Sequence, residues 1–322
     1  MTLDSQNMLQ IIKDFPMQCR EALSLPREIS VSGQVDNIVV TGMGGSAIGG
    51  DLLKTYLSDI DIPVYVNRDY KLPRFVNENS LVFAVSYSGN TEETLSSFND
   101  AKARNAKIIA ITSGGKLADE CEKVITVPSG LQPRAALGYL FLPMLGVLHN
   151  THITRIKNDE LNEMMGILKK TDIFNNSGEE LSKKLKDKIP IIYASEALGA
   201  IALRWKTQIN ENAKMPAFHN VFSEMNHNEI AGYKCMDRKF AVVMIRDKHD
   251  NERIKKRMDI CKDIMEVNVD VEEIETQGES LLARMFSTIY LGDFVSYYLA
   301  LWNRADPSPV EIIEDMKKRL VE

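Results

Sequence analysis

Three hydroxyl side chains and a glycine follow a short apolar run in the first half of the chain. Ser86, Ser88 and Thr91 are spaced i, i+2 and i+5 around Gly89, directly after the apolar residues 81–85 and before a predicted helix. A helix N-terminus carries unpaired backbone N–H groups and a positive partial charge, so hydroxyls added there can hold a dianion without a lysine. The pattern predicts a site for a phosphate monoester. The alternative is that these residues only cap the helix.

A glycine-rich segment favours the phosphate interpretation. Residues 42–50, Gly-Met-Gly-Gly-Ser-Ala-Ile-Gly-Gly, also follow an apolar run. Gly44 and Gly45 allow the backbone to approach a ligand closely, and Ser46 adds a hydroxyl. The spacing also resembles a dinucleotide fingerprint, and Asp69 after the next predicted strand keeps an NAD-binding alternative open. Two loops of this composition after neighbouring strands suit a sugar phosphate better.

Together, these two segments resemble the sugar isomerase (SIS) domain. Further motifs resemble, in order and spacing, the bifunctional phosphoglucose/phosphomannose isomerases over almost the whole chain. They are Pro-Arg-Ala-Ala-Leu-Gly-Tyr at 133–139, Asn-Glu-Asn-Ala-Lys at 210–214, Asn-His-Asn-Glu at 226–229 and Asp-Pro-Ser-Pro-Val at 306–310. The resemblance implies a metal-independent aldose–ketose isomerase without a cofactor, acting on glucose 6-phosphate, fructose 6-phosphate and mannose 6-phosphate.

The resemblance also implies a role for each candidate residue. Glu211 would be the base that moves a proton between C2 and C1 through a cis-enediol, and His227 would open the sugar ring. Arg134 would stabilise the negative charge of the enediolate. Without the resemblance, Glu211 is interpreted as a solvated helix residue and His227 as a hydrogen-bonded loop histidine. His219 is the nearest competitor of His227, and Glu229 could orient the imidazole of His227.

The phosphate group would be held by the hydroxyl residues and by backbone at the glycines: Gly44, Gly45, Ser46, Ser86, Ser88 and Thr91. In the family the histidine comes from the neighbouring subunit. The resemblance therefore implies a homodimer whose active site is shared between subunits.

Ser308 stands where the family has threonine in an Asp-Pro-Thr-Pro segment. That threonine is thought to leave room at C2 for either the glucose or the mannose configuration. Serine keeps the hydroxyl and loses a methyl group, so we expect the pocket to accept both epimers. The alternative is a turn in which Ser308 caps the last helix. Lys317 or Lys318 could also reach the substrate, and the spacing does not choose between them.

The elements that must position these residues alternate between strands and helices. Such alternation predicts a parallel sheet covered on both faces, with ligands at the carboxyl ends of the strands. A polar connection then divides the chain near residue 152, into a phosphate-binding domain at 1–152 and a second domain at 153–322. We expect two doubly wound SIS-type subdomains, flavodoxin-like or Rossmann-like three-layer sandwiches. The strands are expected at about 37–41, 63–66, 81–85, 107–112, 124–127, 189–194, 240–245 and 269–274.

The second domain lacks the phosphate-binding pattern. Its first strand leads into Ser-Glu-Ala-Leu-Gly at 195–199, and the next leads into Arg-Asp-Lys-His at 246–249. Neither segment resembles residues 86–94. We therefore expect the first domain to bind the phosphate and the second to supply catalytic residues.

Composition excludes several classes of function. The chain has 322 residues, 44% of them hydrophobic, and a formal net charge of −6 without a continuous basic stripe, so no nucleic-acid partner is expected. No signal peptide or run of about eighteen apolar residues is visible, and the expectation is a cytoplasmic protein with no membrane partner.

The residues that could bind a metal are scattered. The four cysteines are isolated, and the pair His149 and His152 has no third ligand nearby, so no metal site is predicted. Two functional alternatives stay open: a sugar-phosphate-binding SIS protein without catalysis, and an isomerase of another sugar phosphate.

Overall fold

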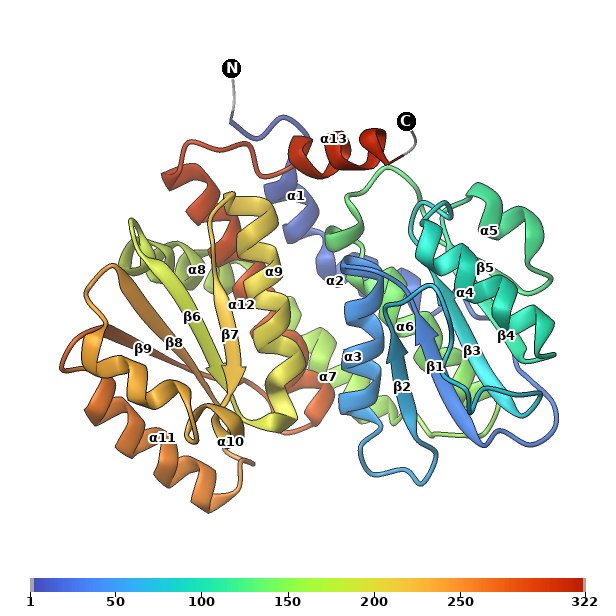
Figure 1. Cartoon of the computed structure of the whole chain (residues 1–322), viewed down its shortest axis with the longest axis horizontal. Helices are drawn as coiled ribbons and strands as arrows, with labels where there is room; N and C mark the ends of the chain where they lie inside the picture. The colour runs from blue at the N-terminus through green and yellow to red at the C-terminus, as the bar shows by residue number, and fades with distance from the viewer. Residues whose placement is uncertain (1–2, 321–322) are drawn as a thin grey trace. The chain divides into compact units, whose positions relative to one another are not determined.

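The computed structural model describes residues 3–320, which form two compact units. The N-terminal unit comprises residues 14–169 and 279–283, and the C-terminal unit comprises 3–13, 170–278 and 284–320. The chain thus divides after Lys169, later than the boundary predicted near residue 152, because α7 (Asn158–Leu168) packs on α2 (Phe15–Ala22) of the N-terminal unit. Each unit has its own parallel sheet (Figure 1).

The sheet of the N-terminal unit has the strand order β2-β1-β3-β4-β5, with every neighbouring pair parallel. Its strands confirm the predicted positions: β1 (Asn37–Thr41), β2 (Val64–Asn67), β3 (Ser80–Val85), β4 (Lys107–Thr112) and β5 (Val124–Thr126). The central strands β1 and β3 are buried along their whole length, as their continuous apolar runs require.

Helices cover both faces of this sheet. The connections run from β1 outward to β2 and from β3 outward to β5 in the opposite direction, so right-handed crossovers place α3 (Gly45–Tyr56) on one face and α4 (Glu92–Ala103) on the other. The helix α6 (Leu137–Asn150) packs against α3 and α2. On the other face, Leu117 of α5 (Gly115–Glu120) and Phe98 of α4 pack together against the sheet in one cluster.

The sheet of the C-terminal unit repeats the first four positions of this order as β7-β6-β8-β9, again all parallel. Three strands confirm predictions: β6 (Ile189–Ala194), β8 (Phe240–Arg246) and β9 (Asp270–Glu275). The edge strand β7 (Phe218–Val221) was not predicted. Both units are therefore doubly wound, as expected.

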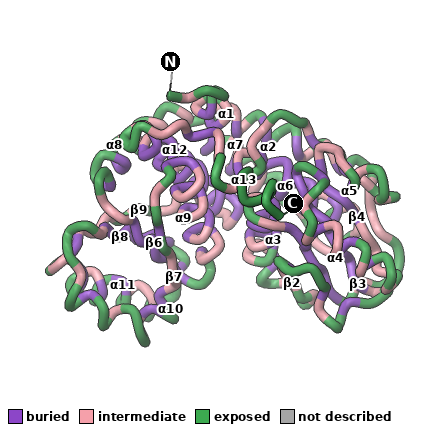
Figure 2. Tube along the Cα trace, turned by 45° about the horizontal axis from the view of Figure 1, so that its top comes forward, coloured by how far each residue is buried: buried purple, intermediate pink, exposed green. Residues whose placement is uncertain are grey.

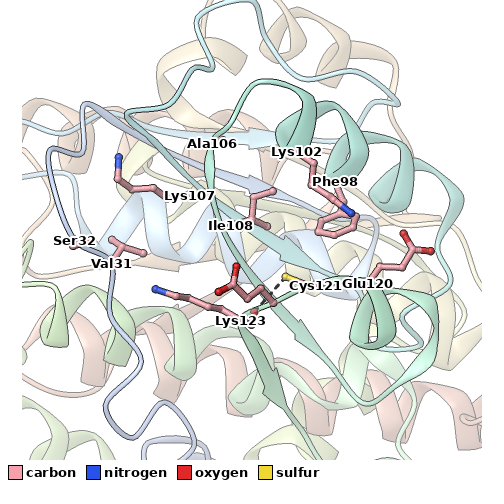
Figure 3. Close-up of a pocket in the computed structure, with 11 residues that line it drawn as sticks. Val31, Ser32, Phe98, Lys102, Ala106, Lys107, Ile108, Glu120, Cys121 and Lys123 are labelled. Carbon is pink, nitrogen blue, oxygen red and sulfur yellow. Dashed lines mark hydrogen bonds between the residues drawn. The ribbon is translucent and has the colours of Figure 1, made fainter.

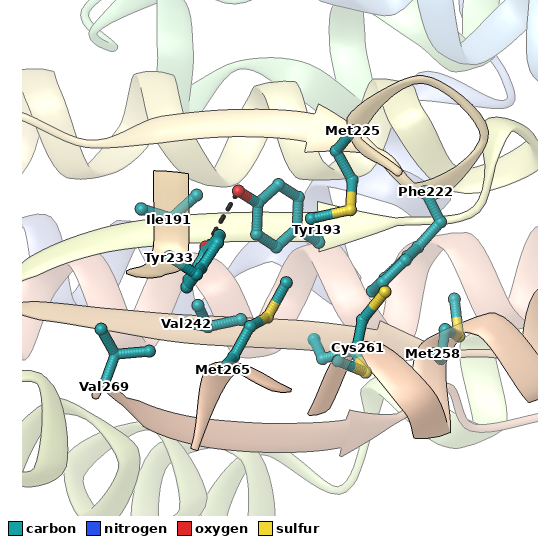
Figure 4. Close-up of a cluster of buried hydrophobic side chains, with 11 residues drawn as sticks. Ile191, Tyr193, Phe222, Met225, Tyr233, Val242, Met258, Cys261, Met265 and Val269 are labelled. Atoms are coloured by element: carbon teal, nitrogen blue, oxygen red, sulfur yellow. Dashed lines mark hydrogen bonds between the residues drawn. The ribbon is translucent and has the colours of Figure 1, made fainter. Parts of the chain in front are cut away.

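The helices of the C-terminal unit also lie on both faces of its sheet. A cluster of buried side chains, including Tyr193, Tyr233 and Met265, joins one face to α10 and α11 (Figure 4). The opposite crossover places α9 on the other face. The α-helices are α1 (Met8–Lys13), α8 (Thr171–Leu185), α9 (Gly199–Ala213), α10 (Phe222–Met225), α11 (Glu252–Met265), α12 (Leu281–Trp302) and α13 (Glu311–Arg319). The helix α12 belongs to this unit from residue 284 onward.

Burial separates the last two helices. The helix α12 contains a long series of buried residues from Leu282 to Ala300, whereas α13 has no buried residue and is largely exposed (Figure 2). The long apolar segment 281–302 is thus a core helix. Within residues 3–320, no helix is both long and apolar enough to cross a membrane.

Candidate active site

The two glycine- and hydroxyl-rich loops meet at one point of the N-terminal sheet. One loop joins β1 to α3, and the other joins β3 to α4. The strands β1 and β3 are neighbours in register, with Thr41 opposite Ala84, so both loops leave the same edge. The strand order reverses direction here, which is where doubly wound sheets bind their ligands.

The start of α3 lies against the segment that carries Arg134. A Cβ atom added to Gly45 would lie 2.8 Å from the backbone nitrogen of Arg134 and 2.9 Å from its Cα, so only glycine fits without a shift. The short 3-10 helix η1 (Pro133–Ala135) places Arg134 here, and the arginine is only 3% exposed. Its Nη1 donates to Oε1 of Gln132 at 3.4 Å. The predicted cation and the predicted phosphate loop therefore adjoin.

The predicted hydroxyls make hydrogen bonds within and between the two loops. The N–H of Tyr87 donates to Oγ of Ser46 at 3.2 Å, which joins the two loops. The hydroxyls of Ser86 and Thr91 lie 2.9 Å apart. Ser88 is exposed, and its Oγ accepts from the N–H of Asn90 at 3.3 Å.

The first turns of both helices lack a side-chain cap. Gly44 occupies the N-cap position of α3 and Thr91 that of α4, and neither helix shows a hydrogen bond from a capping side chain. The hydroxyl of Thr91 interacts with Ser86 instead. Side-chain capping therefore does not account for the hydroxyl of Thr91, whereas Ser88 does accept from a nearby backbone N–H, that of Asn90.

In the C-terminal unit, a pocket of about 540 Å³ brings Glu211 together with the segment 305–313. Glu211 lies in the last turn of α9 and is partly exposed. The lining consists of Asn210, Glu211, Lys214, Met215, Ala305, Asp306, Pro309, Val310, Glu311, Ile312 and Ile313. Two of the motifs that carry the family resemblance therefore share one pocket.

Asp306 is a member of this pocket that sequence reasoning did not single out. Partial burial opposes its ionisation, but hydrogen bonds from Ser5 and from the backbone of Ser308 hold the pKa of Asp306 below its usual range. The N–H of Ser308 donates to Oδ1 of Asp306 at 3.0 Å. Ser308 itself is completely buried and is not among the residues that line the pocket. The motif at 306–310 indicated this segment of the chain. Only the fold shows that Asp306 lines the pocket whereas Ser308 is buried.

His227 lies at the opposite edge of the same sheet from Glu211. The helix α9 returns from the carboxyl edge to the amino edge before β7 begins, and its 15 residues span about 22 Å. Glu211 near its end is therefore at the amino edge. His227 follows β7 and α10, so it is at the carboxyl edge, where it is exposed.

The surroundings of His227 differ from one expectation. Glu229, which we expected could orient the imidazole, accepts hydrogen bonds from the hydroxyl of Tyr193 at 2.8 Å and from Nδ2 of Asn220 at 2.9 Å. The competitor His219 lies in β7, where burial and then the charge of Lys206 lower its pKa. The buried cluster under α10 fixes the loop, and its polar contacts bypass the His227 ring.

In the C-terminal unit, the strand order reverses between β6 and β8. We call the carboxyl edge at such a reversal a switch point, and carboxylates occupy this one. Asp247 follows β8 and accepts from Nε of Arg284 at 2.8 Å, with both residues buried. Asp250 is also buried, and burial raises its pKa above the usual carboxyl range. Buried carboxylates therefore take the place that hydroxyls have at the equivalent position of the N-terminal unit.

The N-terminal unit also contains a larger cavity, of about 610 Å³, at the amino edge of its sheet (Figure 3). Lys107 and Lys123 border it, and their ammonium groups donate to backbone carbonyls of Glu78 and Ser30. Burial raises the pKa of Cys121 in its wall, so its thiol stays protonated at neutral pH. The cavity lies at the edge opposite the phosphate loops, and none of the predicted site residues lines it.

Among residues 3–320, no group of three or more His, Cys, Asp and Glu side chains is arranged to hold a metal ion. All four cysteines lie in this range, and none forms a disulfide.

Both halves of the chain match SIS family models. Residues 33–149 match the SIS domain, and residues 174–320 match the bacterial phospho-glucose isomerase C-terminal SIS domain. Fold and site thus define a protein of two SIS domains. A bifunctional phosphoglucose/phosphomannose isomerase from Caldicellulosiruptor bescii is 47% identical over 336 residues, which covers 98% of this chain and 99% of the relative. One from Thermoplasma acidophilum is 42% identical over 291 residues, 90% of this chain and 91% of the relative. This chain therefore belongs to the family of bifunctional phosphoglucose/phosphomannose isomerases.

Solved structures resemble the fold. The C-terminal domain of glucosamine-fructose-6-phosphate aminotransferase from Francisella tularensis matches with a TM-score of 0.75 at 16% identity, covering 95% of this chain and 98% of that one. At this identity, the likeness concerns the fold alone.

Proposed function

We propose that this protein interconverts glucose 6-phosphate and mannose 6-phosphate with fructose 6-phosphate by acid/base catalysis through a cis-enediol. The observation that carries the proposal lies where the strand order reverses between β1 and β3. There the hydrogen bond from Tyr87 to Ser46 joins two loops that bring the hydroxyls of Ser46, Ser86 and Thr91 to two helix starts without side-chain caps. A catalyst for this reaction must grip a phosphate monoester, and such a site does so without a metal ion. The family membership supports the same substrates.

The phosphate would be bound by hydroxyls and backbone of the N-terminal unit. The hydroxyls of Ser86 and Thr91 would donate hydrogen bonds to its oxygens, and the backbone N–H groups of Gly44 and Gly45 would add charge-assisted hydrogen bonds. The proposed phosphate-binding residues are Gly44, Gly45, Ser46, Ser86, Ser88 and Thr91.

The chemical steps need a base, a ring-opening group and a cation. Glu211, partly exposed in its pocket, would take the proton from C2 and return it to C1. The imidazole of His227 would exchange a proton with the ring oxygen, and the buried guanidinium of Arg134 would stabilise the enediolate. Ser308 would shape the room at C2 by holding Asp306 and the adjoining lining in place.

The placement of His227 and Glu211 supports a homodimer. A hexose phosphate is shorter than α9, and the two side chains lie at opposite edges of one sheet, so one substrate cannot contact both within this unit. We propose that His227 serves the active site of a second copy of the chain. We further propose that the enzyme works in the cytoplasm, where reduced cysteines are the norm.

The test is a coupled assay with fructose 6-phosphate in excess EDTA, reading glucose 6-phosphate and mannose 6-phosphate separately. Both products are expected. Glu211→Gln should lower kcat by at least about 10³-fold while fructose 6-phosphate still binds. The matched control is Glu196→Gln, at an exposed glutamate in the short 3-10 helix before α9. Binding without turnover by the unmodified protein would favour a sugar-phosphate-binding protein, and absence of binding would point to another sugar phosphate.

The shared site has its own test. Mixed dimers of Glu211→Gln and His227→Ala chains should regain about a quarter of the unmodified activity, because half of the dimers are hybrids and each hybrid has one intact site. Mixtures that stay as inactive as their parents would overturn the shared site and leave the isomerase proposal standing.

A further inference from the structure

A series of buried polar contacts joins α9 to α12 in the C-terminal unit. Nη2 of Arg204 donates to both carboxylate oxygens of Asp293 at 2.9 Å, and Nε2 of Gln208 donates to Oδ1 of Asp293 at 2.7 Å. Further along, Nδ2 of Asn212 donates to Oγ of Ser296 at 2.9 Å. We call these five residues the α9–α12 ladder.

The ladder is buried throughout. Arg204, Asp293 and Gln208 are only 2%, 5% and 3% exposed, and Asn212 and Ser296 are 1% and 0% exposed. A buried ion pair adds little net stability, since desolvation of the two charges offsets their attraction. Its distinctive property is direction, because charge-assisted hydrogen bonds to both oxygens of one carboxylate restrict the geometry between two helices as apolar packing does not.

The ladder fixes how α9 is rotated and where it stands along α12. Its α9 members, Arg204, Gln208 and Asn212, recur every four residues and so face α12 along one line. The ring of Trp205 sets the spacing: a Cβ atom on Gly292 would lie 2.3 Å from Nε1 of Trp205, which donates to the carbonyl of Thr288 at 2.9 Å.

The ladder ends next to Glu211. Asn212 directly follows it, and Gln208 lies three residues before it on an adjoining face of the helix. The last turn of α9 is also tied by its backbone. Nζ of Lys214 donates to the carbonyl of Glu211 at 2.6 Å, and Nδ2 of Asn303, just after α12, donates to the carbonyl of Ala213 at 2.9 Å.

We propose that the α9–α12 ladder is a positioning network for the catalytic base, which holds the Glu211 carboxylate where it can reach the C2 proton. The proposal rests on the proposed function of Glu211. Arg204, Gln208, Asn212, Asp293 and Ser296 act through the helix and do not contact the substrate. Proton transfer depends steeply on placement, and a displacement of about 1 Å lowers a rate by about 10²-fold.

The experiment replaces the ion pair and its companion by apolar residues of similar size, as Arg204→Met/Gln208→Leu/Asp293→Leu. No ladder charge is left buried alone, so the protein should still unfold cooperatively. We expect kcat for fructose 6-phosphate to fall by about 10- to 10²-fold and KM to change less than about twofold, because the proposed phosphate-binding residues are untouched.

The matched control is Asp247→Leu/Arg284→Met, which removes the other buried ion pair of α12. That pair lies at the switch point, at the edge opposite Glu211, and kcat should stay within about threefold. Should the triple variant fail to fold, Ser296→Ala removes the hydroxyl that accepts from Asn212, and a smaller fall in kcat of about threefold is expected.

Two measurements separate positioning from general stability. In a Glu211→Asp variant the base is already displaced. The three ladder substitutions should therefore lower kcat much less in that background than in the unmodified enzyme. Amide hydrogen exchange in residues 210–214 should speed up at least about tenfold in the triple variant and stay unchanged in the control.

The outcomes are distinct. A triple variant with kcat within twofold of the unmodified enzyme overturns the proposal, as does an equal loss in the control or a full additional loss on Glu211→Asp. If the unmodified protein isomerises none of the three sugar phosphates, the proposed function fails. Unchanged amide hydrogen exchange in residues 210–214 of the triple variant would then separately overturn the proposal that the ladder positions this part of α9.

Discussion

The two switch points of this chain have the same topology and opposite chemistry. In the N-terminal unit, β1 and β3 lead into Ser46, Ser86 and Thr91 at helix starts without side-chain caps. In the C-terminal unit, β8 leads into the buried carboxylates Asp247 and Asp250, and β6 leads into Ser195. The order of strands fixes where a ligand site can form, but the residues after the strands decide whether an anion enters. Duplicated topology therefore does not imply duplicated binding.

The largest expected effect comes from moving a carboxylate of the second switch point to the first. Ser86 is the first residue after β3 and Asp247 the first after β8. The variant Ser86→Asp therefore places a carboxylate at the first switch point, where the second switch point has one. A negative charge at the phosphate site should lower kcat/KM for fructose 6-phosphate by about 10³-fold, because like charges at contact cost several kcal/mol. Steady-state kinetics check this.

The control is Ser32→Asp, an exposed serine beside the amino-edge cavity of the same unit. Ser86→Ala, which only removes the hydroxyl paired with Thr91, should raise KM by about tenfold. A Ser86→Asp enzyme that unfolds normally and keeps its KM would show that the phosphate lies elsewhere.

A medium effect is expected from replacing the glycine that begins the first helix after a switch point, α3 in the N-terminal unit and α9 in the C-terminal unit. Gly45→Ala places a Cβ atom against the backbone of Arg134, so α3 or η1 must move and kcat/KM should fall by about 10²-fold. Gly199→Ala at the start of α9 meets only a methyl group of Val221, at 2.9 Å, and should cost less than about threefold. Equal losses in the two variants would contradict the assignment of substrate binding to the first switch point alone.

The smallest effect concerns stability. Burial raises the pKa of Asp250, so the folded state binds its proton more tightly than the unfolded state, and stability falls as pH rises from about 3.8 through the folded pKa. Asp250→Asn removes this loss. It should raise the thermal midpoint at pH 7 by a few degrees at most and leave it unchanged below pH 3.8. Calorimetry across this range checks the sign, and a lowered midpoint at pH 7 would show that the carboxylate is the favoured form.

Sequence patterns predicted most of the sheet framework because buried parallel strands are continuous apolar runs, as in β1, β3 and β8. The strand β7 escaped because it is an edge strand whose sequence Phe-His-Asn-Val is half polar and whose residues are exposed or only half-buried. The domain boundary was predicted before α7, near residue 152, because the charged composition of this helix concealed its packing on α2.

The candidate site was predictable in part. The loops around Ser46 and Ser86 converge as expected because parallel neighbours share a carboxyl edge. What separates Glu211 from His227 is the direction of α9 and the presence of β7, and neither is visible in the two short motifs. Likewise, the Asp-Pro-Ser-Pro motif does not reveal that Asp306 faces the pocket while Ser308 is buried.

Residues 3–13 belong to the C-terminal unit, although they precede the N-terminal unit in the sequence. The N-terminal unit is nearly continuous, so it can fold while synthesis proceeds, whereas α1 must wait for Tyr290, whose hydroxyl donates to the carbonyl of Lys13 at 3.4 Å, and for Asp306, the partner of Ser5. The pocket that contains Glu211 is therefore among the last parts of the chain to form. A nascent protein interrupted before α12 has its phosphate loops and Glu211, but it lacks the residues 305–313 that complete the pocket.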